Sequence, residues 1–104
     1  MQYDVYPNPS PKSRDQYPYL VDIQSDLLSA LATRMLVPLA SHDMNQAAIP
    51  QRLCPTVPVA GKGYVLLPHQ AAPLLKIQLK KRVDNARDHA HAIVDAMDAV
   101  IRGF

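Results

Sequence analysis

The side chains that could support covalent or metal chemistry are few and lie far apart in the sequence. All nine acidic residues are aspartates, so glutamate is missing as a general acid or base. Cys54 is the one cysteine, and we expect it to be a small buried hydrophobic residue. The four histidines lack the paired spacing of a zinc site, and His89 and His91 would point about 200° apart on a helix. We therefore expect no catalytic residues, no metal and no cofactor.

Two familiar loop motifs are also missing. No Gly-x-Ser-x-Gly segment occurs, so nothing predicts the exposed nucleophile of a serine hydrolase. The segment Gly61-Lys62-Gly63 has too few glycines for a phosphate-binding loop. It is typical of a hairpin turn, and we predict one there.

Charged residues form two patterns that are typical of surfaces. Steps of three and four residues would gather one set on the helix face opposite the apolar residues: Asp84, Asp88, His91, Asp95, Asp98 and Arg102. This face is either a solvated surface or a docking surface that reaches Phe104, and the spacing alone does not separate the two. A basic run either contacts phosphates or keeps an edge strand and turn soluble, and it comprises Lys76, Lys80, Lys81 and Arg82.

The C-terminal third is predicted to hold the long helix. All ten prolines lie between Pro7 and Pro73, and the residues after them contain none. Asp84 or Asn85 is expected to cap the start of the helix, and Gly103 to end it in a left-handed conformation. The apolar residues expected on its buried stripe are Val83, Ala86, Ala90, Ile93, Met97, Val100 and Ile101.

The first three quarters of the chain predict short strands separated by turns. Residues 7–15 have turn chemistry without apolar anchors and predict an exposed loop, and residues 41–50 predict a second loop. Several short strands followed by one helix predict an α+β fold built on a strongly curved antiparallel sheet. The expected strands are residues 1–6, 19–24, 34–39, 56–59, 64–67 and 74–79.

Length and composition limit the class of protein. The 104 residues suit one domain, residues 1–104, and 48% hydrophobic with 19% charged residues is close to the globular average. A net charge of +2 does not by itself predict nucleic-acid binding. The sequence predicts no membrane span and no secretory signal, and a single cysteine forms no intrachain disulfide, so we expect a cytoplasmic protein.

Three blocks of the sequence together carry a family resemblance. They are Met1-Gln-Tyr-Asp-Val-Tyr, then Tyr19-Leu-Val-Asp-Ile-Gln-Ser-Asp-Leu-Leu, then Arg34-Met-Leu-Val-Pro-Leu-Ala. With these blocks the chain resembles the CcdB toxins of toxin–antitoxin modules. The resemblance continues through Cys54-Pro-Thr-Val to the helix that ends at Gly103, and so covers essentially the whole chain.

The resemblance implies a fold, a function and partners. The fold is an SH3-like barrel of antiparallel strands, shared with the MazF ribonucleases, with one C-terminal α-helix and a homodimeric assembly. CcdB-like proteins are not enzymes: they bind the dimerisation region of the DNA gyrase A subunit and trap gyrase on cleaved DNA. A CcdA-type antitoxin removes the toxin from gyrase and represses the shared operon together with it, so operator DNA is bound only by the toxin–antitoxin complex.

The family's contact positions carry over onto this sequence in two groups. The gyrase contacts correspond to Ser25, Leu27, Leu28, His91, Asp95, Asp98, Arg102, Gly103 and Phe104. The antitoxin contacts correspond to Lys12, Ser13, Arg14, Asp15, Ser41, His42, Asp43, Met44 and Asn45. The helix face described above thereby gains a candidate role in binding.

The C-terminus departs from the family pattern. The best-known members end in Trp-Gly-Ile, whereas this chain ends in Arg102-Gly103-Phe104. A guanidinium facing gyrase arginines loses the aromatic platform and adds like-charge repulsion, a change on the order of a few kcal/mol. Either Phe104 supplies the aromatic surface or Arg102 pairs with a carboxylate. Two alternatives remain: a non-toxic relative that keeps antitoxin binding and operon regulation, and a MazF-like ribonuclease.

Overall fold

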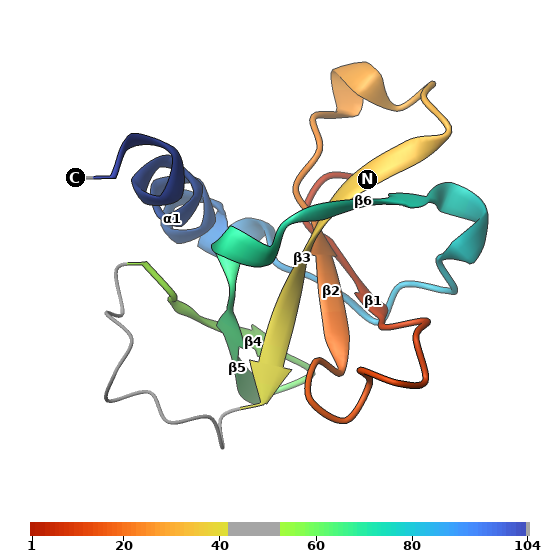
Figure 1. The fold of residues 1–104 in the computed structure, drawn as a ribbon, viewed down its shortest axis with the longest axis horizontal. Coiled ribbons are helices and arrows are strands. Elements are labelled where there is room, and N and C mark those ends of the chain that lie inside the picture. The colour runs from red at the N-terminus through yellow and green to blue at the C-terminus, as the bar shows by residue number, and fades with distance from the viewer. Residues whose placement is uncertain (42–52, 104) are drawn as a thin grey trace.

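The computed structural model describes residues 1–41 and 53–103, and these ranges form a curved antiparallel sheet covered by one α-helix (Figure 1). The strands are β1 (Asp4–Pro7), β2 (Tyr19–Asp22), β3 (Thr33–Ser41), β4 (Thr56–Val59), β5 (Lys62–Leu66), β6 (Ala72–Leu75) and β7 (Asp84–Asn85). The helix is α1 (Ala90–Arg102). Single 3₁₀ turns are η1 (Asp26–Leu28), η3 (Pro68–Gln70), η4 (Lys76–Gln78) and η5 (Arg87–His89).

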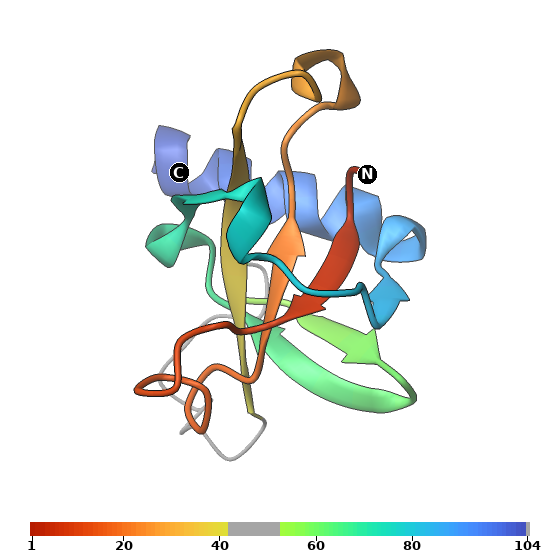
Figure 2. The same ribbon diagram turned by 90° about the vertical axis from the view of Figure 1, so that its right-hand side faces the viewer.

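Strand β3 is the centre of the sheet. The strand order is β4-β5-β3-β2-β1-β7, and β6 also pairs with β3. The second half of β3 pairs with β5, with Leu39 opposite Leu66, while its first half pairs with β6, with Arg34 opposite Leu74. β5 and β6 thus pair with different halves of the long strand β3, and the sheet curves so that its inner face is concave (Figures 1 and 2).

A hydrogen bond joins the two ends of this strand order. The turn between β4 and β5 has positive φ at Ala60 (51°) and Gly61 (84°), as the tight turns that match the twist of a hairpin require. At the tip of this hairpin, the Ala60 N–H donates to Asp84 Oδ2 of β7 at 2.8 Å. The nearly closed barrel and the single C-terminal helix confirm the predicted α+β, SH3-like fold class, and the turn confirms the hairpin predicted at residues 61–63.

The core lies between the concave face of the sheet and α1. Alternate residues of the strands point inward and are fully buried, among them Val5, Val21, Val37 and Leu66. From the helix, the buried side chains are Ile93, Ala96 and Ala99. Cys54 is buried in a smaller second cluster, where burial raises its thiol pKa, so its predicted hydrophobic role is confirmed.

The predicted start of the helix is wrong. Asp84 and Asn85 do not cap it: they form β7 and pair with β1, and the α-helix begins at Ala90 after the turn η5. Their side chains instead bond distant parts of the chain, Asp84 to Ala60 and Asn85 Nδ2 to Asp4 Oδ1 at 2.9 Å. The predicted end is confirmed, because Gly103 adopts φ 68° and its N–H donates to the Ala99 carbonyl at 2.8 Å.

The predicted buried stripe is also partly wrong. Ile93 is buried and Met97 packs against the core, but Val83, Val100 and Ile101 are exposed. The buried face is turned toward Ala96 and Ala99, whose small side chains let the helix lie close to the sheet. The last turn of α1, which holds Ile101, projects past the sheet in Figure 1, and the side chain of Ile101 is 77% exposed.

The strand predictions for residues 34–39 and 56–59 are confirmed by β3 and β4. The strand predicted at 74–79 is wrong from residue 76 onward, because β6 ends at Leu75 and η4 follows. There the Leu75 N–H donates to Gln78 Oε1 at 3.1 Å, a local bond that turns the chain away from the sheet. Of the loop predicted at 41–50, Ser41 belongs to β3 and the rest lies outside the described residues.

None of the helices in the described ranges is long and apolar enough to span a bilayer.

Removing the carboxylate of Asp84 should weaken barrel closure. Hydrogen bonds from the Ala60 and Asn85 N–H groups lower its pKa, while partial burial opposes this and the charge of Arg82 assists it. A lowered folded-state pKa adds stability above the unfolded-state pKa, and this is lost as pH falls through the folded-state value. We expect Asp84→Ala to reduce the free energy of unfolding by about 1–2 kcal/mol near pH 7 and by less near pH 3.

Urea denaturation of both proteins at the two pH values measures this difference. Asp88→Ala is the matched control, because it removes an exposed carboxylate from the neighbouring turn η5. Equal losses in the two variants, or a loss that does not change with pH, would show that the Asp84 carboxylate does not close the barrel.

Candidate functional site

A turn that exposes leucines follows strand β2. Ser25 caps η1, with its hydroxyl accepting from the Leu27 N–H at 3.2 Å. The side chain of Leu27 is 94% exposed, and those of Leu28 and Leu31 are about half exposed. The turn thus holds apolar side chains in solvent, as surfaces that dock a partner do. Three predicted contact residues, Ser25, Leu27 and Leu28, lie together here.

A buried ion pair holds the backbone at the start of this turn. Arg34 of β3 donates through Nε to Asp22 Oδ2 at 2.7 Å, and both side chains are at most 5% exposed. Arg34 Nη2 also donates to the Gln24 carbonyl at 3.0 Å, and the Gln24 N–H donates to Asp22 Oδ1 at 2.9 Å. Asp22, Gln24 and Arg34 therefore fix the backbone at the point where the chain leaves β2.

The side chain of Gln24 forms hydrogen bonds to the end of the turn and to the first residues of β3. Its Nε2 donates to the carbonyls of Leu28 and Thr33, each at 3.2 Å, and its Oε1 accepts from the Met35 N–H at 3.0 Å. Asp26 adds one more link, since its Oδ1 accepts from the Gln2 N–H at 2.9 Å. The block Asp22-Ile-Gln-Ser-Asp is thus a set of polar anchors for the exposed leucines.

The outer face of α1 is mixed rather than purely charged. The predicted contacts His91, Asp95, Asp98 and Arg102 are all exposed on it. Beside them lie Val94, about half exposed, and Ile101, 77% exposed. Asp84 and Asp88 do not extend this face, as the spacing had predicted, because they lie in β7 and η5 before the helix begins.

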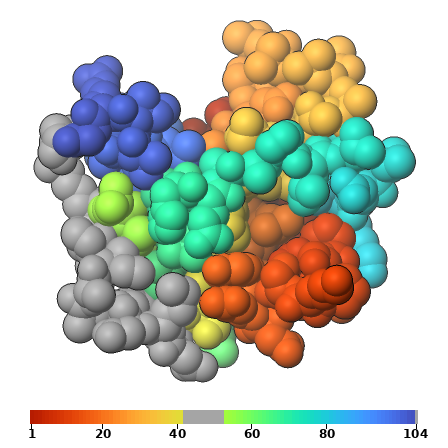
Figure 3. All heavy atoms as spheres, in the orientation of Figure 1, coloured from red at the N-terminus to blue at the C-terminus, as the bar shows by residue number. Residues whose placement is uncertain are grey.

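A hollow lies between the helix and the segment that leads into the leucine turn. It measures about 190 Å³ and is lined from one side by Gln2, Tyr3 and Ile23. From α1 its lining residues are Ile93, Val94, Met97 and Asp98. Figure 3 shows the helix and the leucine turn as two projections separated by a valley. Asp98 of α1 and Ile23, which precedes the turn, therefore line the same hollow. We call the leucine turn, this hollow and the outer face of α1 together the leucine–helix surface.

The leucine–helix surface continues to the end of the helix. Arg102 is the last helical residue and is exposed, and Gly103 ends the helix in the left-handed conformation. Phe104, the last predicted contact of this group, lies outside the described residues.

The first loop, which holds four residues of the second predicted group, lies at the end of the barrel away from the leucine turn (Figures 1 and 2). Buried Asn8 organises the first loop: its Oδ1 accepts from the Ser10 N–H, and its Nδ2 donates to Ser13 Oγ and to the Tyr17 carbonyl. The side chains that this loop exposes are Lys12, Arg14 and Asp15, with Ser13 partly covered. An apolar hollow of about 170 Å³ beside the loop is lined in part by Ser13, Leu36 and Leu74.

Only part of the second group can be placed. Ser41 ends β3 opposite Tyr64 and is half-buried. His42, Asp43, Met44 and Asn45 lie outside the described residues.

The sequence predicted Leu27 and Leu28 of the leucine–helix surface but not its other exposed apolar residues. Leu31 received no role, Val94 was not singled out, and Ile101 was assigned to the buried stripe. The seven-residue spacing of Val94 and Ile101 does place both on one side of a helix. It could have revealed a second apolar stripe beside the acidic residues.

Comparison with known proteins agrees with this architecture. The family model described as CcdB protein matches residues 2–103. The chain belongs to the CcdB family. No curated protein matches it. Membership in the CcdB family confirms the resemblance carried by the three sequence blocks, and it supports the role of a toxin in a toxin–antitoxin module.

Two substitutions should distinguish the exposed side chains of the leucine turn from the side chain that holds its backbone in place. Leu27→Ser should change the free energy of unfolding by no more than about 0.5 kcal/mol, because the side chain is solvent-exposed. Gln24→Ala should cost about 1–3 kcal/mol, because it removes the side-chain acceptor of the Met35 N–H and the donor shared by the Leu28 and Thr33 carbonyls. Denaturant unfolding of both variants measures the difference, and similar losses would contradict this division.

Proposed function

We propose that this protein is a toxin that binds the DNA gyrase A subunit and traps the DNA-cleavage complex, as a binding protein without catalytic chemistry or cofactor. It acts in the cytoplasm as a single-domain homodimer. One observation carries the proposal: in a chain of the CcdB family, Ile23, which precedes the leucine turn, lines one hollow together with Val94 and Asp98 of the outer face of α1.

The leucine–helix surface has the composition of a binding site. Leu27, Leu28 and Val94 offer apolar area that a partner can remove from water. Asp95 and Asp98 present carboxylates next to that area and suit a basic partner surface such as one rich in arginine. Apolar anchors beside charged groups give both affinity and orientation.

The end of α1 supports the homodimer. Val100 and Ile101 lie in the last turn of α1, which projects past the sheet, and they are 38% and 77% exposed. A second copy meeting the first at this end would bury both side chains and would bring the two copies of Arg102 and Gly103 close together. Each dimer would then present one continuous surface to gyrase.

The first loop supports a second binding event, that of a CcdA-type antitoxin. Lys12 and Arg14 are exposed there beside the apolar hollow, so an acidic and apolar antitoxin segment would find complementary chemistry. The antitoxin would occupy the end of the barrel away from the leucine turn. The toxin–antitoxin complex, rather than the toxin alone, would bind operator DNA and repress the operon.

A second candidate function rests on Arg102. The exposed guanidinium at the end of α1 replaces the aromatic residue of the best-known relatives and would repel gyrase arginines. On that basis the protein would be a non-toxic relative that keeps antitoxin binding and operon regulation. The two candidates differ in whether the protein binds gyrase at all.

Calorimetric titration of the purified gyrase A dimerisation region into the protein tests the proposal. We expect saturable binding that Leu27→Ser and Asp98→Asn each weaken by about tenfold or more, because both remove contacts from the centre of the surface. Asp88→Asn is the matched control, since it removes an exposed carboxylate outside the surface and should leave the affinity unchanged. Absence of binding by the folded wild-type protein would favour the second candidate.

The role of Arg102 can be measured in the same titration. Arg102→Trp should tighten gyrase binding by about tenfold if the guanidinium opposes gyrase arginines. Unchanged or weaker binding would mean that Arg102 itself makes a favourable contact, such as a pair with a gyrase carboxylate.

A further inference from the structure

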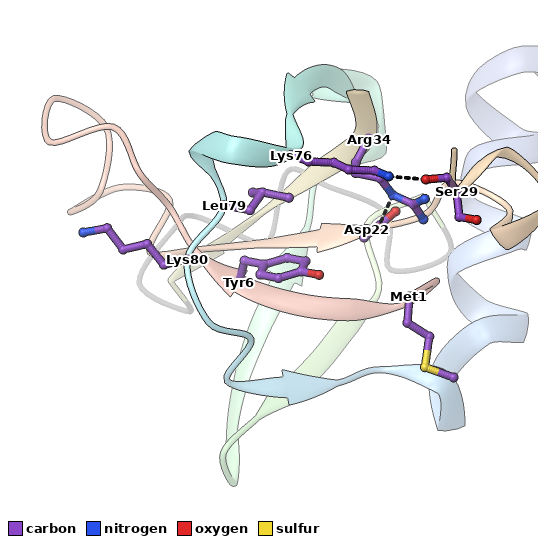
Figure 4. Close-up of a pocket in the computed structure, with 8 residues that line it drawn as sticks. All are labelled: Met1, Tyr6, Asp22, Ser29, Arg34, Lys76, Leu79 and Lys80. Atoms are coloured by element: carbon purple, nitrogen blue, oxygen red, sulfur yellow. Dashed lines mark hydrogen bonds and ion pairs between the residues drawn. The ribbon is translucent and has the colours of Figure 1, made fainter. Parts of the chain in front are cut away.

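A hollow on a different part of the barrel is lined by cations. It measures about 280 Å³ and lies between the starts of β1 and β3 and the segment after β6 (Figure 4). The lining residues that matter for its chemistry are Tyr6, Asp22, Arg34, Lys76 and Lys80. None of them is among the residues assigned to gyrase or the antitoxin.

Arg34 places a nearly buried positive charge beside the hollow. Its side chain is 5% exposed, with Nε bonded to Asp22 and Nη2 to the Gln24 carbonyl. Its third nitrogen, Nη1, has no hydrogen-bond acceptor among residues 1–41 and 53–103. A buried guanidinium with a spare donor is suited to receive an acceptor from a bound molecule.

Lys76 adds a second cation, which forms no ion pair with a carboxylate in the described part of the chain. Its ammonium donates to the Ser29 carbonyl, which is neutral, and its backbone N–H is held by the Ala32 carbonyl at 2.9 Å. Figure 4 shows this ammonium and the Arg34 guanidinium on the same side of the hollow, while the side chain of Lys80 extends outward from the rim. Arg34 and Lys76 are therefore held on one side of the hollow by bonds within the protein, whereas Lys80 is not.

The carboxylates nearby do not balance these charges. Three cations line the hollow, Arg34, Lys76 and Lys80, against the one carboxylate of Asp22. Asp26, which does not line it, is half exposed and lies 3.8 Å from Arg34 Nη2. Three positive and two negative groups leave the surroundings net positive, which favours an anion.

Tyr6 supplies a neutral donor to the same hollow. Burial raises the pKa of its phenol, and the nearby charges of Asp4 and Asp22 raise it further. The hydroxyl therefore stays protonated at neutral pH and can donate a hydrogen bond.

We propose that this hollow binds a phosphate group, either free phosphate or the phosphate of a small ester. The tetrahedral oxygens would accept from Arg34 Nη1, the Lys76 ammonium and the Tyr6 hydroxyl, a set of fixed donors of which two are charged. The volume holds a phosphate with part of an attached group. The site is separate from the leucine–helix surface, so its test does not depend on gyrase binding.

Amide NMR titrations of the full-length protein test the site. Inorganic phosphate and adenosine monophosphate are added separately, in chloride buffer at constant ionic strength. We expect saturable shifts centred on Tyr6, Ser29, Lys76 and Leu79. Tighter binding of the nucleotide would identify a phosphate ester as the ligand class, and equal binding would identify free phosphate; either result supports the site.

Two variants and a matched control decide whether the hollow itself binds. Lys76→Gln should weaken binding by about tenfold, and Tyr6→Phe, which removes only the hydroxyl, should weaken it less. Lys81→Gln removes the same charge from an exposed neighbouring position and should leave the affinity unchanged. Shifts that do not saturate, or an equal loss in Lys76→Gln and Lys81→Gln, would overturn the proposal by showing general attraction to basic residues.

Discussion

The buried ion pair between Asp22 and Arg34 is the interaction on which the functional surfaces depend. Its two groups are almost free of solvent and lie where β2, β3 and the leucine turn meet. Removing one partner would leave an uncompensated buried charge, which typically costs about 3–5 kcal/mol. On one side the pair orders Gln24 and hence the exposed leucines, and on the other Arg34 faces the cationic hollow. One buried interaction thereby supports both proposed binding sites.

The rest of the fold sets where these sites lie. Asp84 joins the two ends of the strand order through the tip of the β4–β5 hairpin, so a short chain forms a nearly closed barrel. Ala96 and Ala99 let α1 pack closely over the core, and the helix then extends past the sheet with Val94 and Ile101 in solvent. The exposed Leu27 and Val94 offer apolar area of the kind that docks a protein partner.

The sequence predicted elements that depend on local chemistry. The strand at residues 56–59, the hairpin turn at Gly61 and the helix end at Gly103 follow from neighbouring residues, and the structure confirms all three. The helix start was wrong because the partner of Asp84 is Ala60, 24 residues away, and no local pattern reveals such a bond. The leucine turn was found through a family motif, whereas the cationic hollow joins residues from Tyr6 to Lys80 that meet only in the folded chain.

The central claim is that the protein poisons gyrase by binding, and a cleavage assay tests it most directly. Purified protein is added to cognate gyrase, ATP and supercoiled plasmid, and linear DNA is quantified after treatment with detergent and protease. Poisoning predicts that linear DNA accumulates as the concentration of the protein rises. Unchanged supercoiling without linear DNA, from protein shown to be folded and dimeric, would contradict the account.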